Sequence, residues 1–432
     1  MRIKLTALFT ALCVLALSFV GCSEKKSDSS DLDLSSSKSE SSDTADDNAV
    51  PPSDSLLEKY PVSESKIDLS KGATENMIGR SVLNKGDVSR LKEKLVNGSK
   101  GKKTTICFLG DSITEGSSAD EEHQYVTGFT NWWTENIGEA EKINAGVGGT
   151  TSYLGVHRLQ SSCLDYEPDI IFVEFINDTD TENYEASMDS IVRKCLKQKN
   201  NPAVIILEPT LQDGSSPQNA HYKVAKAYDI PMISYHDAIM PEIKAGNFSW
   251  EDISPDNVHP NNDGHGIMAQ LLTGFAESVM SDDTVPSTAN SFDDSTSAPA
   301  GDIYENAVIA DKRSDESLLK VIDEGTFTEK TSYRNYVNGW KTTKGGTIKF
   351  EVNARNIGLL YVMTVDGKSG IARVTVDGME LGIANADYVG GWGNMIASTE
   401  FYTSDKAEKH TVEVKTIGEE SCTFILAGLL LS

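Results

Sequence analysis

The chain has 432 residues, of which 65 are Asp or Glu and 39 are Lys or Arg, so its formal net charge at pH 7 is −26. So acidic a chain repels the phosphate backbone of nucleic acids, and no basic patch interrupts the charge, which excludes a nucleic-acid-binding protein. The length is sufficient for two ordinary domains, each with its own core.

The first 21 residues have the pattern of a signal peptide. A basic start precedes an apolar stretch from residue 5 to 20, which is too short for a stable membrane span. The tripeptide at 20–22 (Val-Gly-Cys) resembles a bacterial lipobox, which implies that Cys22 is lipidated and becomes the mature N-terminus. We therefore expect a protein anchored by lipid to a membrane at the bacterial cell surface, with plain secretion as the alternative.

Two low-complexity stretches divide the rest of the chain. Residues 22–65 are rich in Ser and Asp and nearly free of aromatic side chains. This composition cannot bury enough apolar surface to offset the entropy of ordering the chain, so it predicts a flexible tether. The stretch at 282–302, also rich in Ser, Thr and Asp, predicts a linker. The expected globular domains are therefore 66–281 and 303–432.

In the first domain, apolar strand-like runs alternate with helical patterns. The expected strands are 104–109, 142–145, 170–175, 203–207 and 232–235. The expected helices include 87–96, 128–137, 184–198, 238–245 and 264–280. Strands that alternate with helices indicate βαβ units, so we expect a three-layer α/β/α domain whose parallel sheet is covered on both faces.

Four short polar segments stand in fixed order along this domain, and each of the first three directly follows an expected strand. They are 110–114 (Gly-Asp-Ser-Ile-Thr), the Gly-rich run 144–152, 175–178 (Phe-Ile-Asn-Asp) and 256–260 (Asp-Asn-Val-His-Pro). Residues just past the carboxyl ends of parallel strands converge on one crevice, so the segments are expected to meet. They supply a hydroxyl, a backbone N–H at glycine, a side-chain amide and an Asp/His pair, which are the groups needed to acylate and deacylate a serine.

This set of segments resembles the SGNH hydrolases, also called GDSL esterases. The resemblance covers about residues 75–281 and is strongest to the carbohydrate-esterase branch, through stretches such as 106–116 and 172–175. It implies a flavodoxin-like α/β/α fold and hydrolysis of esters. In one departure, many members have Gly two residues before the Asn of the third segment, where this chain has Phe175. That difference can narrow the pocket and leaves the chemical groups in place.

The resemblance also implies a role for each chemical group. Ser112 is the expected nucleophile, and His259 is the base toward it and then the acid toward the leaving alcohol. Asp256, three residues before His259, can reach Nδ1–H and leave Nε2 free for the serine. The expected oxyanion hole consists of the Ser112 and Gly149 N–H groups and the Asn177 amide.

Residues near the motifs are candidate substrate contacts: Asp111, Trp132, Tyr153, Asp178 and Trp392. The tryptophan at 132 has helical spacing, so its alternative place is the core. Trp392 lies in a Gly-rich loop of the second domain, at 388–394, which we take as the candidate for glycan contact.

The second domain has a different periodicity. Apolar and polar residues alternate strictly at 347–352, 373–376 and 410–415. Alternation with Gly- and Asp-rich turns predicts an antiparallel β-sandwich. The region resembles the jelly-roll accessory modules attached to many carbohydrate esterases.

The motifs give no indication of a cofactor. The chain has no Cys-x-x-Cys pair or Cys/His cluster of the kind that holds a metal. The Gly-rich run at 146–149 has Thr151 where a dinucleotide fingerprint needs its last glycine. We therefore expect neither a metal nor a nucleotide.

The combined expectation is a serine esterase that removes acyl groups, above all acetyl, from an extracellular polysaccharide. One alternative is a lipase, lysophospholipase or thioesterase of the same fold. Another is a non-catalytic, glycan-binding surface lipoprotein. Chain-length profiling of synthetic esters distinguishes the first alternative, and glycan binding without esterase activity would indicate the second.

Overall fold

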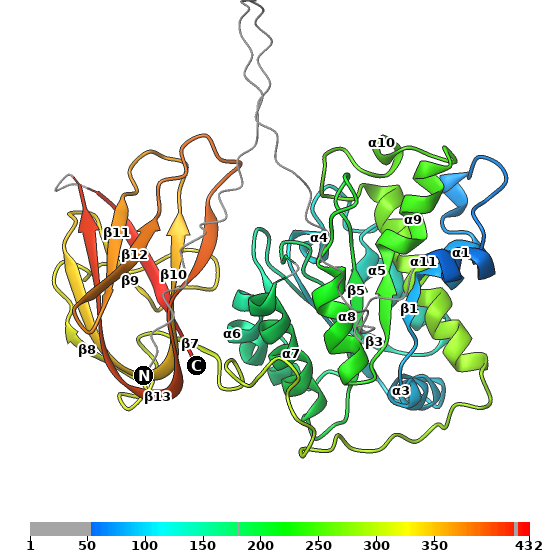
Figure 1. The fold of residues 1–432 in the computed structure, drawn as a ribbon, viewed down its shortest axis with the longest axis horizontal. Coiled ribbons are helices and arrows are strands. Elements are labelled where there is room, and N and C mark those ends of the chain that lie inside the picture. Colours follow the sequence, from blue (N-terminus) through cyan, green and yellow to red (C-terminus); the bar gives the residue numbers. More distant parts are fainter. Residues whose placement is uncertain (1–52, 180, 419–421) are drawn as a thin grey trace, which may run out of the picture. The chain divides into compact units, whose positions relative to one another are not determined.

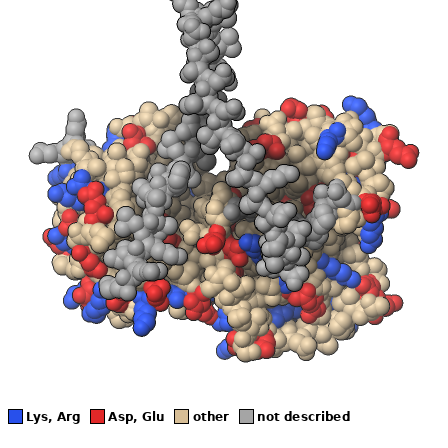
Figure 2. All heavy atoms as spheres, viewed as in Figure 1, with Lys and Arg blue, Asp and Glu red and all other residues tan. Residues whose placement is uncertain are grey.

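The computed structural model of the protein describes residues 53–179, 181–418 and 422–432. The predicted signal peptide, Cys22 and the tether as far as residue 52 lie outside the described residues. Among the helices described, none combines the length and the apolar character needed to cross a membrane. On the face seen in Figure 2, the Lys and Arg side chains are dispersed among Asp and Glu side chains.

A six-stranded sheet forms the centre of the first domain (Figure 1). Its strands are β1 (Val82–Asn84), β2 (Thr104–Gly110), β3 (Ala140–Gly146), β4 (Ile170–Val173), β5 (Ala203–Glu208) and β6 (Met232–Ser234). The spatial order is β1-β6-β5-β4-β2-β3, in which β2 to β6 are parallel and β1 joins β6 antiparallel. The parallel part has the flavodoxin-like order, with its switch point at β2, so the predicted fold class is confirmed.

Helices cover both faces of this sheet. They are α2 (Glu75–Ser81), α3 (Ser89–Ser99), α4 (Ser112–Glu115), α5 (Tyr125–Asn136), α6 (Ser152–Ser162), α7 (Glu182–Leu196), α8 (Gln218–Ala227), α9 (Tyr235–Lys244), α10 (Trp250–Ile253) and α11 (Asn262–Ser281). Apolar side chains of α6, α7 and α8 pack in one core cluster, and those of α3, α5, α9 and α11 pack in the other. The central strands β2, β4 and β5 are mostly apolar because both of their faces are buried, whereas β3, at the edge of the sheet, contains exposed polar residues.

The start of the first domain differs from its prediction. The expected tether runs to residue 65, but a short helix, α1 (Ser53–Lys59), and the residues after it are bonded to the domain. The Tyr60 carbonyl accepts from Arg80 Nη1 at 2.8 Å, and Ser63 N donates to Glu242 Oε2 at 3.1 Å. Composition alone did not reveal these long-range hydrogen bonds, which hold the segment in place.

The linker at 282–302 is coil and lies against α7. The Arg193 guanidinium donates to the carbonyl oxygens of Asp294 and Thr296, and Ala300 N donates to Asp189 Oδ2 at 2.7 Å. The stretch thus has the expected irregular structure, but its backbone is bonded to the first domain.

The second domain consists of antiparallel strands. They are β7 (Val308–Ala310), β8 (Leu319–Asp323), β9 (Trp340–Thr342), β10 (Thr347–Met363), β11 (Ile371–Val376), β12 (Met379–Asn385), β13 (Met395–Ile417) and β14 (Phe424–Leu431). Every pairing between these strands is antiparallel. The alternating residues of β10, such as Phe350 and Val352, point into one apolar core. The all-β prediction is confirmed.

Helix α6 is buried between the central sheet and the second domain. Leu154 of α6 shares a core cluster with Leu360 of β10 and with Ala427 and Leu430 of β14. All residues from 152 to 159 are buried. The loop that precedes α6 is thereby placed beside the second domain, and this loop contains the predicted Gly149.

Candidate active site

Ser112 lies at the switch point of the sheet, as the first residue of α4 directly after β2. Asp111 caps this helix, because its Oδ1 accepts the Ile113 N–H at 3.1 Å. A Cβ on Gly110 would lie 2.1 Å from Thr114 Oγ1 and 2.7 Å from the Glu174 carbonyl oxygen, so this tight turn requires glycine. The Ser112 N–H stands at a helix start, where it has no intrahelical acceptor.

His259 lies within hydrogen-bond distance of the serine. Ser112 Oγ is 2.9 Å from His259 Nε2, and His259 Nδ1 is 2.9 Å from Asp256 Oδ2. The other Asp256 oxygen accepts the N–H groups of Val258 and His259, each at 2.7 Å. Burial alone would raise the pKa of Asp256, but these hydrogen bonds and the His259 ring lower it overall. The three side chains therefore form one chain of hydrogen bonds with the carboxylate ionised at its far end.

Gly149 follows β3 and has φ +72°, a conformation that favours glycine. The neighbouring Gly148 N–H donates to Glu115 Oε2 at 2.7 Å. By contrast, the Gly149 N–H has no hydrogen-bond partner among the described residues. Of the two N–H groups, that of Gly149 is the one free for a ligand.

Asn177 follows β4, and its amide is held by the protein. Nδ2 donates to Asp111 Oδ2 at 2.8 Å and to the Thr150 carbonyl oxygen at 3.2 Å. The Asn177 backbone N–H donates to the same Asp111 oxygen at 3.1 Å. Both amide hydrogens thus have acceptors, and a ligand would have to displace the longer bond.

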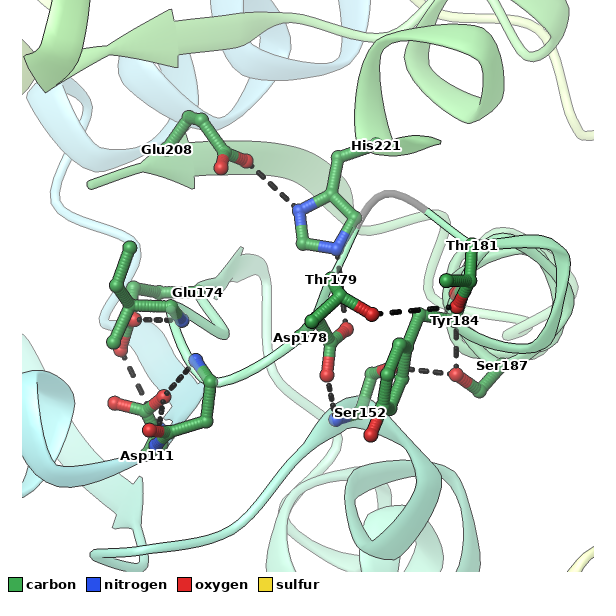
Figure 3. A network of polar contacts seen from close by, with 12 residues as sticks. Asp111, Ser152, Glu174, Asp178, Thr179, Thr181, Tyr184, Ser187, Glu208 and His221 are labelled. Atoms are coloured by element: carbon green, nitrogen blue, oxygen red, sulfur yellow. Dashed lines mark hydrogen bonds and ion pairs between the residues drawn. The ribbon is translucent and has the colours of Figure 1, made fainter. Parts of the chain in front are cut away.

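A buried network of carboxylates and one imidazole lies behind these loops (Figure 3). Its members are Asp111, Glu174, Asp178, Glu208 and His221, each less than one-tenth exposed. Burial, and then the neighbouring Glu174, raises the pKa of Asp111 well above its ordinary value. Burial also raises the pKa of Glu174, which accepts from Thr114 Oγ1 at 2.7 Å and from Ile176 N at 2.9 Å.

Sequence reasoning missed most of this network. Glu174 and Glu208 stand at or just past the ends of apolar strands, which is the one local signal that could have marked them. His221 lies on α8 outside every motif. Only its contacts with Glu208 and Asp178, which lie on other elements, identify it as part of the network.

Most of the residues predicted to contact the substrate are buried or bonded within the protein. Asp111 and Asp178 are buried, and each of their carboxylate oxygens accepts a hydrogen bond from the protein or faces His221. These two side chains therefore have no oxygen directed at a substrate. Tyr153 is buried against the second domain, where its hydroxyl donates to Asn356 Oδ1 at 3.2 Å. Trp132 is partly buried against the α5/α11 layer, and its Nε1 donates to Glu277 Oε1 at 2.9 Å.

Trp392, in contrast, lies beside the predicted oxyanion hole. A Cβ on Gly149 would be 3.4 Å from Trp392 Cζ2 and 2.8 Å from Met395 Cε. The indole is 66 % exposed. A second link joins the domains here, because Arg334 Nη1 lies 2.9 Å from Glu115 Oε1, whose other oxygen accepts from Gly148. The second domain therefore lies against the loop that carries Gly148 and Gly149.

The chain was compared with protein families and with solved structures, and both comparisons find esterases or acylhydrolases. Residues 108–267 match the GDSL-like Lipase/Acylhydrolase family. The structure is similar to a two-domain esterase (CEX) active on acetylated mannans, with a TM-score of 0.75 and 29% sequence identity over 82% of this chain and 97% of that one. The same esterase co-crystallised with mannopentaose gives a TM-score of 0.73 and 28% identity, over 82% and 96% of the two chains.

Among curated sequences, the chain is similar to thioesterase 1/protease 1/lysophospholipase L1 of Escherichia coli K12. The two are 21% identical over 191 residues, which cover 42% of this chain and 86% of the Escherichia coli protein.

Proposed function

We propose that the protein removes acetyl groups from an extracellular polysaccharide. Residues 108–267 match the GDSL-like lipase/acylhydrolase family and the structure is similar to a two-domain esterase, so the protein is a carboxylic ester hydrolase. The observation that carries the proposal is the pair of 2.9 Å contacts that join Ser112 to His259 and His259 to Asp256. A serine hydroxyl is a weak nucleophile without such a base.

In the acylation step, His259 Nε2 takes the Ser112 proton as the serine oxygen attacks the ester carbonyl. Asp256 holds Nδ1–H and stabilises the imidazolium that forms. The imidazolium then donates its proton to the leaving sugar oxygen, which yields acetyl-Ser112 and a free hydroxyl. A water then gives a proton to His259 Nε2 as its oxygen attacks the acetyl carbonyl. The bond to Ser112 Oγ breaks, His259 returns the proton to that oxygen, and acetic acid leaves and ionises to acetate.

The tetrahedral oxyanion is held by the N–H groups of Ser112 and Gly149 and by the Asn177 amide. The free Gly149 N–H supports this assignment. For Asn177, we propose that the oxyanion replaces Thr150 as acceptor, since that bond is the longer of the two, at 3.2 Å against 2.8 Å. Donors of this kind act on charge that develops in the transition state.

An acetylated mannan is the first substrate to test. The two-domain esterase with which this chain shares both domains is described as active on acetylated mannans and was crystallised with mannopentaose. We also propose that lipid on Cys22 anchors the enzyme at the bacterial cell surface, on the basis of the sequence pattern at 20–22.

Released acetate provides the test of substrate class. Purified protein incubated with acetylated mannan, acetylated xylan, pectin and peptidoglycan is expected to release acetate fastest from the mannan. The Ser112→Ala protein is the matched control and is expected to release none. Failure to release acetate from any polysaccharide, while simple aryl esters are hydrolysed, would contradict the proposed substrate class.

The second candidate activity is hydrolysis of long-chain acyl esters or thioesters, which the similarity to the Escherichia coli thioesterase/lysophospholipase favours. Rates on 4-nitrophenyl esters from acetate to palmitate separate the two. We expect the acetate ester to be the best substrate, and a maximum at eight carbons or more would favour the second candidate.

Trp392 is expected to contribute to polysaccharide binding, because its exposed indole lies next to Gly149. Trp392→Ala should raise KM for acetylated mannan about two- to thirteenfold, the effect of losing roughly 0.5–1.5 kcal/mol of aromatic contact. KM for 4-nitrophenyl acetate should not change. Tyr166→Ala is the matched control, since this exposed aromatic precedes the amino end of β4, whereas Gly149 follows the carboxyl end of β3. An unchanged KM for mannan in Trp392→Ala would exclude the contact.

A further inference from the structure

His221 is a buried histidine held between two carboxylates (Figure 3). It lies on α8 and is 1 % exposed. Nδ1 is 2.8 Å from Glu208 Oε2, and Nε2 is 3.1 Å from Asp178 Oδ2. Burial alone would lower the pKa of this imidazole, but Glu208 and Asp178 raise it to about 10. Both ring nitrogens therefore carry protons at neutral pH and donate to the two carboxylates.

Each of the two carboxylates is also hydrogen-bonded to a further loop at the carboxyl ends of the parallel strands. Asp178 Oδ1 accepts the Ser152 N–H at 2.9 Å, which fixes the start of α6. Glu208 Oε1 accepts from Ser216 Oγ at 2.6 Å, in the loop that precedes α8. His221 therefore connects the loops that follow β3, β4 and β5.

Two of these loops carry predicted oxyanion donors. Gly149 is three residues before Ser152, and Asn177 is the residue before Asp178. The Asn177 amide is also bonded to the Thr150 carbonyl at 3.2 Å, so the two loops hold each other directly as well. A shift of the Asp178 carboxylate would move both donors, because it is bonded to one loop and covalently part of the other.

We propose that His221 is a positioning residue of the oxyanion hole, which holds the Asp178 carboxylate and through it the relative placement of Gly149 and Asn177. The inference rests on the proposed function, since it assigns no contact with the substrate. A buried ionic network seldom adds net stability over apolar packing of the same volume, whereas it can fix one geometry. Loops that supply transition-state donors need fixed geometry, because an error of about 1 Å can lower the rate about a hundredfold.

The test is the rate per functional site in His221→Gln. A glutamine side chain is neutral and has a single nitrogen. It cannot replace both ring nitrogens of His221, which face Glu208 and Asp178 on opposite sides of the ring. The kcat for 4-nitrophenyl acetate is expected to fall by about tenfold to a hundredfold with KM changed less than about twofold. Sites are counted by stoichiometric phosphonylation of Ser112, so that unfolded protein does not lower the apparent kcat.

His157→Gln is the matched control. His157 is also a buried helical histidine, but its Nδ1 is 2.7 Å from the Tyr153 carbonyl and burial lowers its pKa to about 3. This variant is expected to lower the melting temperature and leave kcat per titrated site unchanged. An unchanged kcat per site in His221→Gln, as in the control, would overturn the inference and leave His221 a structural residue.

Two further variants keep the inference falsifiable if His221→Gln does not fold. Glu208→Gln retains an acceptor for Ser216 and weakens the hold on His221, so it should lower kcat per site about threefold or more. Asp178→Asn retains an acceptor for Ser152 and removes the charge that faces His221, so it should also lower kcat per site about threefold or more. Unchanged kcat per site in both variants would overturn the inference.

The wild-type protein separates this inference from the proposed function. If the wild type does not hydrolyse aryl acetate, the proposed function fails and the inference falls with it. If the wild type is active and the network variants match it per titrated site, only the inference fails.

Discussion

Replacing Ser112 with alanine is expected to lower kcat for 4-nitrophenyl acetate by about 10⁴-fold or more. In the proposed mechanism the hydroxyl forms the covalent bond to the acyl group, and its proton passes to His259 Nε2, which lies 2.9 Å away. With alanine, only the oxyanion donors and binding remain to assist attack by water. Initial rates at saturating ester, measured together with the melting temperature, provide the check.

Two comparisons make this prediction specific. Ser161→Ala removes an exposed hydroxyl from α6, so rate and melting temperature should both be unchanged. Combining Ser112→Ala with His259→Ala should cost no more than Ser112→Ala alone, because the two side chains act as one unit. If Ser112→Ala keeps more than about one hundredth of the wild-type rate, a different nucleophile performs the reaction.

The strands that are buried along their whole length could be predicted from the sequence. Strands β2, β4 and β5 are buried on both faces, so their sequences are continuous apolar runs with definite ends. The meeting of Ser112, Gly149 and Asn177 follows from the same property, since each stands just past the end of a parallel strand. His259 was found through its motif and the nearby Asp256.

Other elements lack a local signal for physical reasons. Helix α6 was absent from the expected helices because it is buried from residue 152 to 159 and so has no polar face to create a helical stripe. The same burial explains why Tyr153 is enclosed by the second domain instead of facing a substrate. Strand β1 has three residues, too few for any periodicity.

The buried network was the hardest part to predict. Composition places charged side chains at the surface, and only a tertiary partner makes their burial tolerable. Glu208 is buried because His221 stands 2.8 Å away, and the two residues come from different elements. The proximity of Trp392 to Gly149 has the same character, since it depends on how the second domain packs against α6.

Asn177→Ala is expected to lower kcat by about a hundredfold to a thousandfold, the usual cost of losing one side-chain donor from an oxyanion hole. KM for 4-nitrophenyl acetate should change little, because this donor acts on charge that is absent from the ground state. The fold should survive, since Asp111 Oδ2 keeps the backbone N–H of residue 177 at 3.1 Å. Steady-state kinetics on titrated sites, with melting temperatures, provide the measurement.

The control for Asn177→Ala is Asn200→Ala. The Asn200 amide likewise donates to two carbonyl oxygens, those of Glu167 at 3.0 Å and Pro168 at 2.7 Å. It precedes the amino end of β5, whereas Asn177 follows the carboxyl end of β4. Equal losses of melting temperature in the two variants with a loss of kcat in Asn177→Ala alone would separate transition-state stabilisation from loop stability. If Asn177→Ala retained the wild-type kcat, the amide would serve only to join Asp111 to Thr150, and the oxyanion would depend on the N–H groups of Ser112 and Gly149.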